Sequence, residues 1–404
     1  EALTYRSSIP FVEDILAIMI PPAKQGNSFY KFWSRAMEPW DGPAFISYSD
    51  GSSIGGRLDR NGFRPCRWIV TDDHLYLSSE TGSFEIDPAA VKRKGTLQAG
   101  NGIKMELENG KIHFRDPSYS RENYDADFEH RLEQLKPGII TEADNSSINK
   151  HLFKYTREDI ENLLVPMITD GKEPIGSMGD TARPALFSDQ PRSFFDYFYQ
   201  NFAQVTNPPL DYIREKMVTD LSMYLGKRPN IFSPKELIPQ FPGFEIESPL
   251  LSLGQMKTLR GINNSPSRIT TAEFEMTFSR DHGEVGFRSA IRNITEKAIK
   301  AVKDGATILI ISDRNATSKQ PPIPSLLMLR SLVNALNESG LRLNASIVVD
   351  TAEVRNTHQF AALVGFGATA VCPYKALEFA RFGDHRKFKN LDSDIREENV
   401  IKAF

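Results

Sequence analysis

The stretch Thr307-Ile-Leu-Ile-Ile-Ser312 decides the fold, because it predicts a short apolar strand from which a regular alternation of elements extends. Helices are predicted over 325–337, 354–364 and 375–382, and further strands over 345–350 and 370–371. Strands that alternate with helices imply right-handed βαβ units on a parallel sheet. The second half of the chain is therefore predicted to be an α/β domain.

Polar residues follow each predicted strand. Asp313 and Arg314 come directly after the first, Asp350 and Glu353 close the second, and Pro373-Tyr374 follows the third. Carboxyl ends of parallel strands are where such sheets place functional side chains. Two interpretations stay open for this strand-end polar edge. The carboxylates cap turns or helices and the charges pair with neighbours, which we favour, or the edge is catalytic.

The first part of the chain has a different pattern. Short alternating segments, separated by Asp-Gly, Asn-Gly and Asp-Asp turns, predict strands at 44–48, 68–71, 75–79 and 104–107. An antiparallel sheet is expected there. The segment from 116 to about 142 is rich in charged residues and poor in β-branched residues, which is typical of a connecting segment. The predicted parts are 1–120, a connector over 121–154, and the α/β domain over 155–404.

A proline pair marks a predicted functional loop. In Gln204-Val-Thr-Asn-Pro-Pro-Leu-Asp211 two consecutive prolines fix a kinked loop with polar edges. The preceding residues, 188–203, are rich in aromatic side chains and are predicted to form a helix that supports the loop. The candidate residues are Gln204, Thr206, Asn207, Pro208, Pro209 and Asp211.

Composition excludes several classes of function. The net charge of -3 and the pI near 6.2 favour neither nucleic acid nor an anionic membrane surface as a partner. The apolar run at 15–22 is far shorter than the ~20 residues of a membrane span. Two cysteines, Cys66 and Cys372, suit a reducing cytoplasm, and the seven histidines lack ligand spacing, so no metal site is expected.

Three local motifs are interpreted as structural. The glycine-rich segment 365–370 precedes a predicted strand instead of following one, which argues against a phosphate loop. Cys66 lies between Arg64 and Arg67 but has no local histidine, so a structural thiol is favoured over a nucleophile. In 55–62, Arg57, Asp59 and Arg60 are expected to form a structural charge network in a turn region.

Longer motifs carry a family resemblance. Those of the first part are Met37-Glu-Pro-Trp-Asp-Gly-Pro-Ala44, Asp50-Gly51 and Leu58-Asp-Arg-Asn-Gly62 with Arg64-Pro65. Those of the second part are Gly176-Ser-Met-Gly-Asp180, Phe202-Ala-Gln-Val-Thr-Asn-Pro-Pro209, Asp304-Gly-Ala-Thr307 and Gly365-Phe-Gly-Ala368. In this order they resemble the large (alpha) subunit of the glutamate synthase family. The first set matches the end of its class II glutamine amidotransferase domain, and the second its central domain.

The resemblance implies a fold and a reaction. The fold is the C-terminal part of an Ntn-type amidotransferase β-sheet region, followed by the α/β central domain. The family hydrolyses glutamine at an N-terminal cysteine, passes ammonia through a tunnel, and makes glutamate from 2-oxoglutarate with FMN and an iron-sulfur cluster. The resemblance places those centres before Glu1 and after Phe404. The chain is therefore expected to be a fragment without catalytic, cofactor or metal residues, and inactive alone.

Implied partners are the amidotransferase and FMN regions of the same polypeptide, and a small electron-transfer subunit or ferredoxin. We hypothesise that Thr206 and Asn207 face the entry of the ammonia tunnel. The sequence departs from the family at Cys372, where Asn is common, at Cys66, often Ala, and after Asp180, where a second acidic residue is missing. Two alternatives remain open: a stand-alone, non-catalytic interaction module, and a flavin-binding α/β enzyme.

Overall fold

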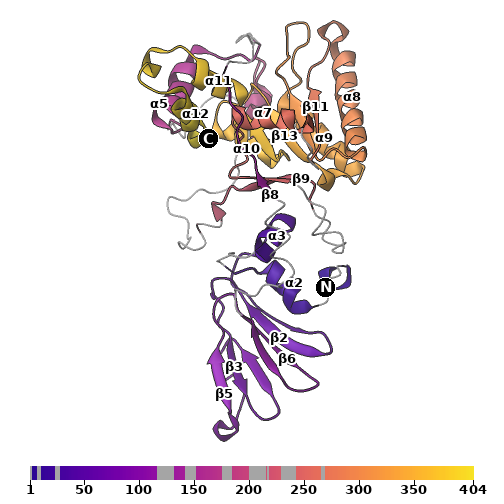
Figure 1. Ribbon diagram of the computed structural model, residues 1–404, viewed down its shortest axis with the longest axis vertical. Helices are drawn as coiled ribbons and strands as arrows, with labels where there is room; N and C mark the ends of the chain where they lie inside the picture. The colour runs from indigo at the N-terminus through magenta and orange to yellow at the C-terminus, as the bar shows by residue number, and fades with distance from the viewer. Residues whose placement is uncertain are drawn as a thin grey trace. The chain divides into compact units, whose positions relative to one another are not determined.

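The computed structural model describes most of the chain (Figure 1). The described residues are 2–6, 11–22, 28–115, 132–141, 152–174, 184–199, 215, 218–228, 243–264 and 269–404. They divide between two compact units. The first comprises 1–132, 205–220 and 228–241, and the second comprises 133–204, 221–227 and 242–404. Each unit is described by itself below.

The first unit combines short helices with antiparallel sheets. Its helices are α1 (Ala2–Arg6), α2 (Val12–Met19) and α3 (Ser28–Ala36). One sheet has the order β1-β2-β6-β7, from Phe45–Ser49, Ser53–Leu58, Gly102–Glu106 and Ile112–Arg115. The other has the order β4-β3-β5, from Leu75–Ser78, Arg67–Val70 and Arg93–Thr96. All five strand pairings of these two sheets are antiparallel, which agrees with the alternating pattern of the sequence.

Two small apolar clusters stabilise the first unit. The helices bury Ile15, Ile18, Phe29, Tyr30 and Trp33 among themselves, while Leu58, Cys66, Leu97 and Ile103 form a cluster at the sheets. Helix α2 contacts strand β2, an inner strand, so the helical part packs against the four-stranded sheet. The burial of large side chains by α2 and α3 supplies the apolar stabilisation that short helices need.

The second unit is built on a parallel sheet. Its order is β11-β12-β13-β14, from Thr271–Glu275, Ile308–Ser312, Ser346–Asp350 and Ala370–Cys372. Helices α8 (Gly283–Lys303), α9 (Ser325–Glu338) and α10 (Thr357–Gly365) lie between these strands in the sequence. A parallel pairing cannot be closed by a tight hairpin, so each strand returns through a helix. The parallel sheet predicted from the alternation of elements is confirmed.

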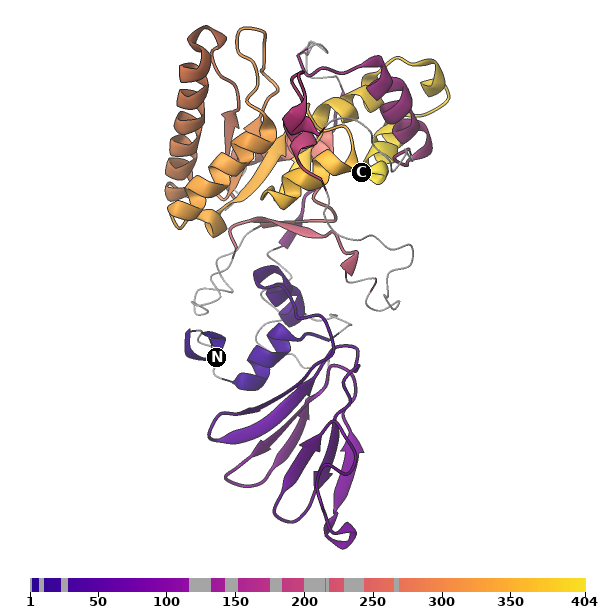
Figure 2. The ribbon, with the colours of Figure 1, turned by 180° about the vertical axis from the view of Figure 1, so that it is seen from behind.

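Helices cover both faces of this sheet. Figure 2 shows helices on either face of the sheet. In β12, Leu309 and Ile311 belong to the same apolar cluster as α8, α9 and α10. Ile308 and Ile310 point to the other cluster, which contains residues of α7 (Leu253–Gly261), α5 (Val165–Asp170) and α11 (Tyr374–Phe382). The alternation follows from the two-residue period of a strand.

Smaller elements complete the second unit. They include the π-helix Asp159–Leu164, the sheet β8-β10-β9 (Leu132–Gln134, Gly243–Ile246, Met223–Gly226) and α12 (Ser393–Ala403). The 3-10 helices are Ala185–Phe187, Phe194–Tyr197, Ile262–Asn264, Arg280–His282, Arg342–Asn344 and Arg386–Phe388. The helix predicted over 188–203 is wrong in its described part. Pro191 breaks the helical run, and Ser193 and Asp196 cap a single 3-10 turn through reciprocal side-chain contacts.

Among the described residues, no helix combines the length and the apolar character needed to cross a membrane.

A substitution at Gly55 tests the close packing of the first sheet. A Cβ at this position would lie 2.4 Å from the carbonyl oxygen of Ile103 and 2.7 Å from the ring of Tyr48. Because a backbone oxygen of the neighbouring strand cannot retreat freely, Gly55→Ala is expected to reduce the free energy of unfolding by about 1–3 kcal/mol. Urea unfolding followed by circular dichroism measures this, since it reports on the strands of the first unit and on the helices of the second.

Gly261→Ala is the matched control, because a Cβ there meets nothing within 4 Å at the end of α7. It is expected to leave stability unchanged or to raise it slightly. Equal stability of Gly55→Ala and the unsubstituted chain would contradict the packing.

Candidate functional site

The strand-end polar edge lies where three parallel strands end. Register places Ser312 of β12 beside Asp350 of β13, and Asp350 beside Cys372 of β14. Asp313 and Arg314 follow β12 directly, so their side chains emerge at the same edge. Glu353 belongs to the turn after β13. The structure therefore brings together the four residues that the sequence marked, in hydrogen-bonded contact with further side chains.

Asp350 is the centre of this edge. Its fully buried carboxylate accepts hydrogen bonds from Arg314 Nε at 2.7 Å, Arg260 Nη2 at 2.7 Å and Ser312 Oγ at 2.9 Å. Arg314 Nη2 donates to the second oxygen at 3.2 Å. Burial raises the pKa of Asp350, but the two guanidinium groups outweigh burial and hold the pKa below its usual value. Asp350 is therefore an ionised cross-link.

Arg260 and Arg314 each bind a second carboxylate in addition to that of Asp350. Arg260, from α7, donates to Glu273 of β11 through Nε at 3.0 Å and Nη2 at 2.6 Å. Arg314 donates from Nη1 to Glu378 of α11 at 2.8 Å. We call Glu273, Arg260, Asp350, Arg314 and Glu378 the carboxyl-edge network. Its charges alternate in sign along the edge, and each is paired with an opposite charge.

The aromatic ring of Tyr374 packs against the Arg314 guanidinium of the carboxyl-edge network. The guanidinium of Arg314 lies 4.0 Å from the ring centroid, a distance typical of a cation–π contact. Burial and the nearby carboxylates of Asp313 and Asp350 raise the pKa of the Tyr374 hydroxyl. Burial lowers the pKa of Arg314, but the carboxylates reverse this shift and raise it. The guanidinium is thus fixed as a cation between a ring and two carboxylates.

Asp313 lies in a contrasting environment. Its buried carboxylate accepts hydrogen bonds from Thr351 Oγ1 at 2.6 Å and from the backbone amide of Ala352 at 3.0 Å, both in the turn after β13. Burial raises the pKa of Asp313 to about 8, against the opposing effect of the Thr351 hydrogen bond. Asp313 anchors the turn and carries a proton at neutral pH in most molecules.

Glu353 caps a helix from the same turn. Its carboxylate accepts hydrogen bonds from the backbone amide of Ser325 at 2.7 Å and from the Ser325 hydroxyl at 2.5 Å, at the first residue of α9. The free amides at a helix N-terminus attract a carboxylate. Burial raises the pKa of Glu353, and the two hydrogen bonds from Ser325 reduce that shift. The capping role agrees with the structural interpretation of this residue.

The turn after β13 also contacts the residues just before the π-helix Asp159–Leu164. The Tyr155 hydroxyl donates to the carbonyl oxygen of Ala352 at 2.7 Å, and the Arg355 guanidinium lies 4.1 Å from the Tyr155 ring centroid. Arg355 also pairs with Asp159 at 3.0 Å. The turn therefore links the edge of the parallel sheet to the segment around 155–159.

The chemistry available at this edge is limited. Every charge of the carboxyl-edge network is engaged by an opposite one, which leaves it unsuited to act as a base. Burial raises the pKa of the Cys372 thiol above its ordinary value, and that of Cys66 to about 12, so neither is poised as a thiolate. Within the described residues no cluster of His, Cys, Asp and Glu fits a metal ion. The geometry favours a structural role.

The sequence missed several members of the edge. Arg260, Glu273 and Glu378 lie 90, 77 and 28 residues from Asp350, and no local pattern marks them as its neighbours. The capping box of Ser252 and Gln255 marks the start of α7, which carries Arg260, but it does not indicate contact with Asp350. The predicted loop residues Gln204, Thr206, Asn207, Pro208, Pro209 and Asp211 lie outside the described residues.

Arg57, Asp59 and Arg60, the residues of the expected charge network, each bind groups elsewhere in the first unit; Arg60, for example, pairs with Asp41 at 3.5 Å. Asp59 instead accepts backbone amides, among them those of Phe63 at 3.0 Å and Arg64 at 3.0 Å. Arg60 Nη2 donates to the carbonyl of Trp40 at 2.7 Å. The three side chains alternate along a strand and its turn, so they point to different neighbours. Asp59 fixes the loop that carries the Asn-Gly motif.

Comparison with known proteins defines the class. Residues 8–127 match the family described as glutamine amidotransferases class-II, and residues 149–404 match the glutamate synthase central domain. The chain thus joins an amidotransferase region to a glutamate synthase central region. It belongs to the glutamate synthase family.

Relatives that match the chain come from distant organisms. "Ferredoxin-dependent glutamate synthase 2" of Synechocystis is 38% identical over 375 residues, which cover 88% of this chain and 23% of the relative. "Glutamate synthase [NADPH] large chain" of Bacillus subtilis is 37% identical, with coverage of 88% and 23%. "Glutamate synthase [NADH]" of Schizosaccharomyces pombe is 32% identical, with coverage of 98% and 20%. The chain spans less than a quarter of the length of these relatives.

The opposite environments of the two aspartates generate a pH prediction. The pKa of Asp313 rises from 3.8 to about 8 on folding, so its contribution to stability is present at low pH and is lost as pH rises through about 8. Asp313→Asn does not titrate. The stability of this variant relative to the unsubstituted chain should therefore improve by a few kcal/mol between about pH 5 and about pH 9. Urea unfolding followed by circular dichroism at each pH measures the difference.

Asp350→Asn is the matched control with the opposite sign. The pKa of Asp350 is lowered on folding, so its contribution is present above 3.8 and is lost as pH falls through the lower, folded value. The penalty of Asp350→Asn should shrink towards acid pH. If both variants show the same pH profile, the assignment of the two environments is wrong.

Proposed function

We propose that this chain is the part of a glutamate synthase that connects the glutaminase and FMN sites. The parent enzyme makes L-glutamate from L-glutamine and 2-oxoglutarate by reductive amidotransfer, and is an oxidoreductase. The observation that carries the proposal is the order of the two family matches, 8–127 and then 149–404, in one chain. The names of the relatives support the same activity.

The finer fold assignment is also part of this proposal. We assign 1–120 to the C-terminal part of an Ntn-type amidotransferase region, 121–154 to a connector, and 155–404 to the central domain with right-handed βαβ units. The antiparallel sheets of the first unit and the parallel sheet of the second support these assignments. The use of only two cysteines supports a reducing compartment such as the cytoplasm.

The catalytic centres of the parent enzyme do not fit the residues of this chain. An iron-sulfur cluster is held by several cysteine thiolates, and this chain has two cysteines, buried in different units. The strand-end polar edge does not suit a flavin phosphate, since Arg260 and Arg314 already pair with carboxylates. FMN and the cluster are therefore assigned to the remainder of the polypeptide, and the chain alone to a non-catalytic role.

Partners follow from the same reasoning. The chain works together with the amidotransferase and FMN regions of its own polypeptide. An electron donor, either a small electron-transfer subunit or ferredoxin, serves the complete enzyme. The relatives carry both kinds of name, ferredoxin-dependent and nicotinamide-dependent.

In this proposal, the chain helps to carry ammonia from the glutaminase site to the FMN site of the complete enzyme. Ammonia has to travel without meeting bulk water, which requires a rigid passage. The carboxyl-edge network supplies rigidity, because seven side-chain hydrogen bonds tie together β11, the end of β12, β13, α7 and α11. We assign the tunnel entry to the proline loop, with Thr206 and Asn207 facing it.

The proline loop is tested in the complete enzyme. Thr206→Val removes a hydroxyl while it keeps the shape of the side chain. Glutamine hydrolysis should continue, but glutamate formed from 2-oxoglutarate should fall at least about tenfold relative to glutamine consumed, because ammonia escapes. Thr206→Ser, which retains the hydroxyl, should keep the two rates coupled. Unchanged coupling in Thr206→Val would remove this loop from the tunnel.

A further inference from the structure

A segment of irregular backbone lies across helices α7 and α11 and is held there by its main chain. We call residues 135–140 the strap. The carbonyl oxygens of four of its residues accept hydrogen bonds from side chains, namely those of Leu135, Lys136, Ile139 and Ile140. The donors are, in the same order, Gln255 Nε2 at 3.3 Å, Thr258 Oγ1 at 2.9 Å, Lys257 Nζ at 2.9 Å and Arg381 Nη2 at 3.4 Å. Three donors belong to α7 and the fourth to α11, so two helices fix the path of the strap.

The strap and α7 also touch backbone to backbone. The amide of Gly138 donates to the carbonyl oxygen of Gly254 at 2.9 Å, and a Cβ on Gly254 would lie 2.6 Å from the carbonyl oxygen of Gly138. Leu135 is buried in the apolar cluster that contains residues of α7, whereas Ile139 is 81% exposed. Beyond Leu135 the strap buries little apolar surface, so hydrogen bonds do most to hold it, and each of them contributes only modestly to stability. Such a segment can open while the parallel sheet stays folded.

An ion pair at the end of the strap joins it to helix α12. Arg381, which holds the carbonyl of Ile140, donates through Nη1 to Glu397 Oε2 of α12 at 2.8 Å. The other carboxylate oxygen, Oε1, accepts from the backbone amide of Leu253, the first residue of α7, at 3.1 Å. Asp394 Oδ1 of α12 also lies 2.5 Å from Arg381 Nη1. Glu397 therefore fixes both supports of the strap, the arginine on α11 and the start of α7.

We propose that Arg381 and Glu397 form a clasp that couples the docking of the strap to the packing of α12. While the clasp is closed, α12 supplies the counter-charge of Arg381 and the acceptor for a free amide at the start of α7. When α12 moves away, or when the carboxylate is removed, Arg381 and Leu253 lose these partners, and the strap leaves α7 without unfolding of the parallel sheet. The coupling is reciprocal, because a strap that is loosened from α7 stabilises the clasp less.

The position of the clasp in the sequence gives it a role that rests on the proposed function. The strap begins shortly after residue 132, where the chain passes from the first unit to the second, and α12 is the last helix of the described residues. Under the proposed function, the strap follows the amidotransferase region and α12 precedes the FMN region. The clasp then transmits a displacement of one region to the attachment of the other. The contacts of the clasp do not depend on this role, so they are tested without any measurement of activity.

Digestion of the folded chain with thermolysin tests the clasp. The protease cleaves before bulky apolar residues, so cuts before Ile139 and before Ile140, identified by mass spectrometry, report the opening of the strap. The cleavage rate follows the population of the open form when the strap recloses quickly. Glu397→Gln keeps the shape of the side chain and removes its charge. It should accelerate these cuts about tenfold or more, because a shielded arginine loses a counter-charge.

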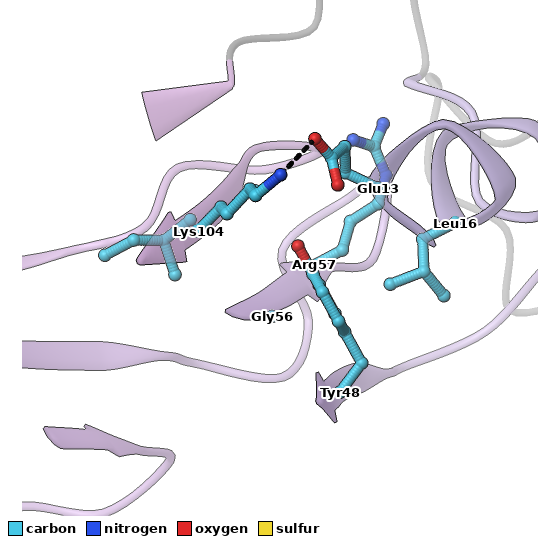
Figure 3. Close-up of a pocket in the computed structure, with 8 residues that line it drawn as sticks. Glu13, Leu16, Tyr48, Gly56, Arg57 and Lys104 are labelled. Carbon is cyan, nitrogen blue, oxygen red and sulfur yellow. Dashed lines mark hydrogen bonds and ion pairs between the residues drawn. The ribbon is translucent and has the colours of Figure 1, made fainter. Parts of the chain in front are cut away.

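The matched control is an ion pair of similar burial in the first unit. Figure 3 shows Lys104 of β6 and Glu13 of α2 at a small pocket, with Lys104 Nζ 3.1 Å from Glu13 Oε1. Their side chains are 15% and 11% exposed, against 17% and 8% for Arg381 and Glu397. Glu13→Gln should therefore leave the cuts in the strap at the rate of the unsubstituted chain. Equal rates in Glu13→Gln and Glu397→Gln would overturn the proposal.

Thr258→Val tests the coupling in the reverse direction. It removes the hydroxyl that holds the carbonyl of Lys136 and leaves Arg381 and Glu397 in place. Hydrogen–deuterium exchange of the α12 amides should become several times faster, while exchange in β12 and β13 stays unchanged. Unchanged exchange in α12, or an equal acceleration in β12 and β13, would contradict the coupling. This measurement also decides the case in which Glu397→Gln does not fold.

Discussion

The ionised carboxylate of Asp350 is the interaction on which the second unit depends. It is fully buried, and it holds Arg314 and Arg260 at 2.7 Å each. Removing three charges from water is costly, so the arrangement persists only because each charge finds opposite partners and hydrogen bonds. These partners come from the strand region and from helices α7 and α11, which share one face of the sheet. The positions of these elements at the carboxyl edge are therefore tied to one side chain.

This constraint explains why an edge that usually carries ligands is closed in this molecule. Parallel sheets place binding residues at their carboxyl ends, and the chain has the polar residues to do so. In this molecule the guanidinium groups of Arg260 and Arg314 already pair with Asp350, Glu273 and Glu378. The carboxylate of Glu353 already caps α9. A rigid, internally balanced edge agrees with the proposed role of this chain as a connection between two reaction centres. Under that proposal, the catalytic chemistry belongs to other regions of the polypeptide.

Much of the parallel sheet was predictable, because its strands are uninterrupted apolar runs bounded by helices. The predicted ranges 307–312 and 345–350 correspond to β12 and β13. The meeting of Asp313, Arg314, Asp350 and Glu353 followed from the common direction of the strands. Strand β11 escaped prediction because Glu273 and Glu275 interrupt its apolar residues at an exposed edge. The long-range partners of Asp350 had no sequence signal, since only folding brings them close.

The free energy of unfolding of Asp350→Asn at neutral pH tests the central claim most directly. Urea unfolding followed by circular dichroism is compared with Glu284→Gln, which breaks an exposed ion pair with Arg288 on α8. If Asp350 holds the carboxyl edge together, its substitution should cost about 3–5 kcal/mol, because two arginines lose their buried counter-charge. The exposed control should cost less than about 1 kcal/mol. A cost for Asp350→Asn as small as that of the control would contradict the account.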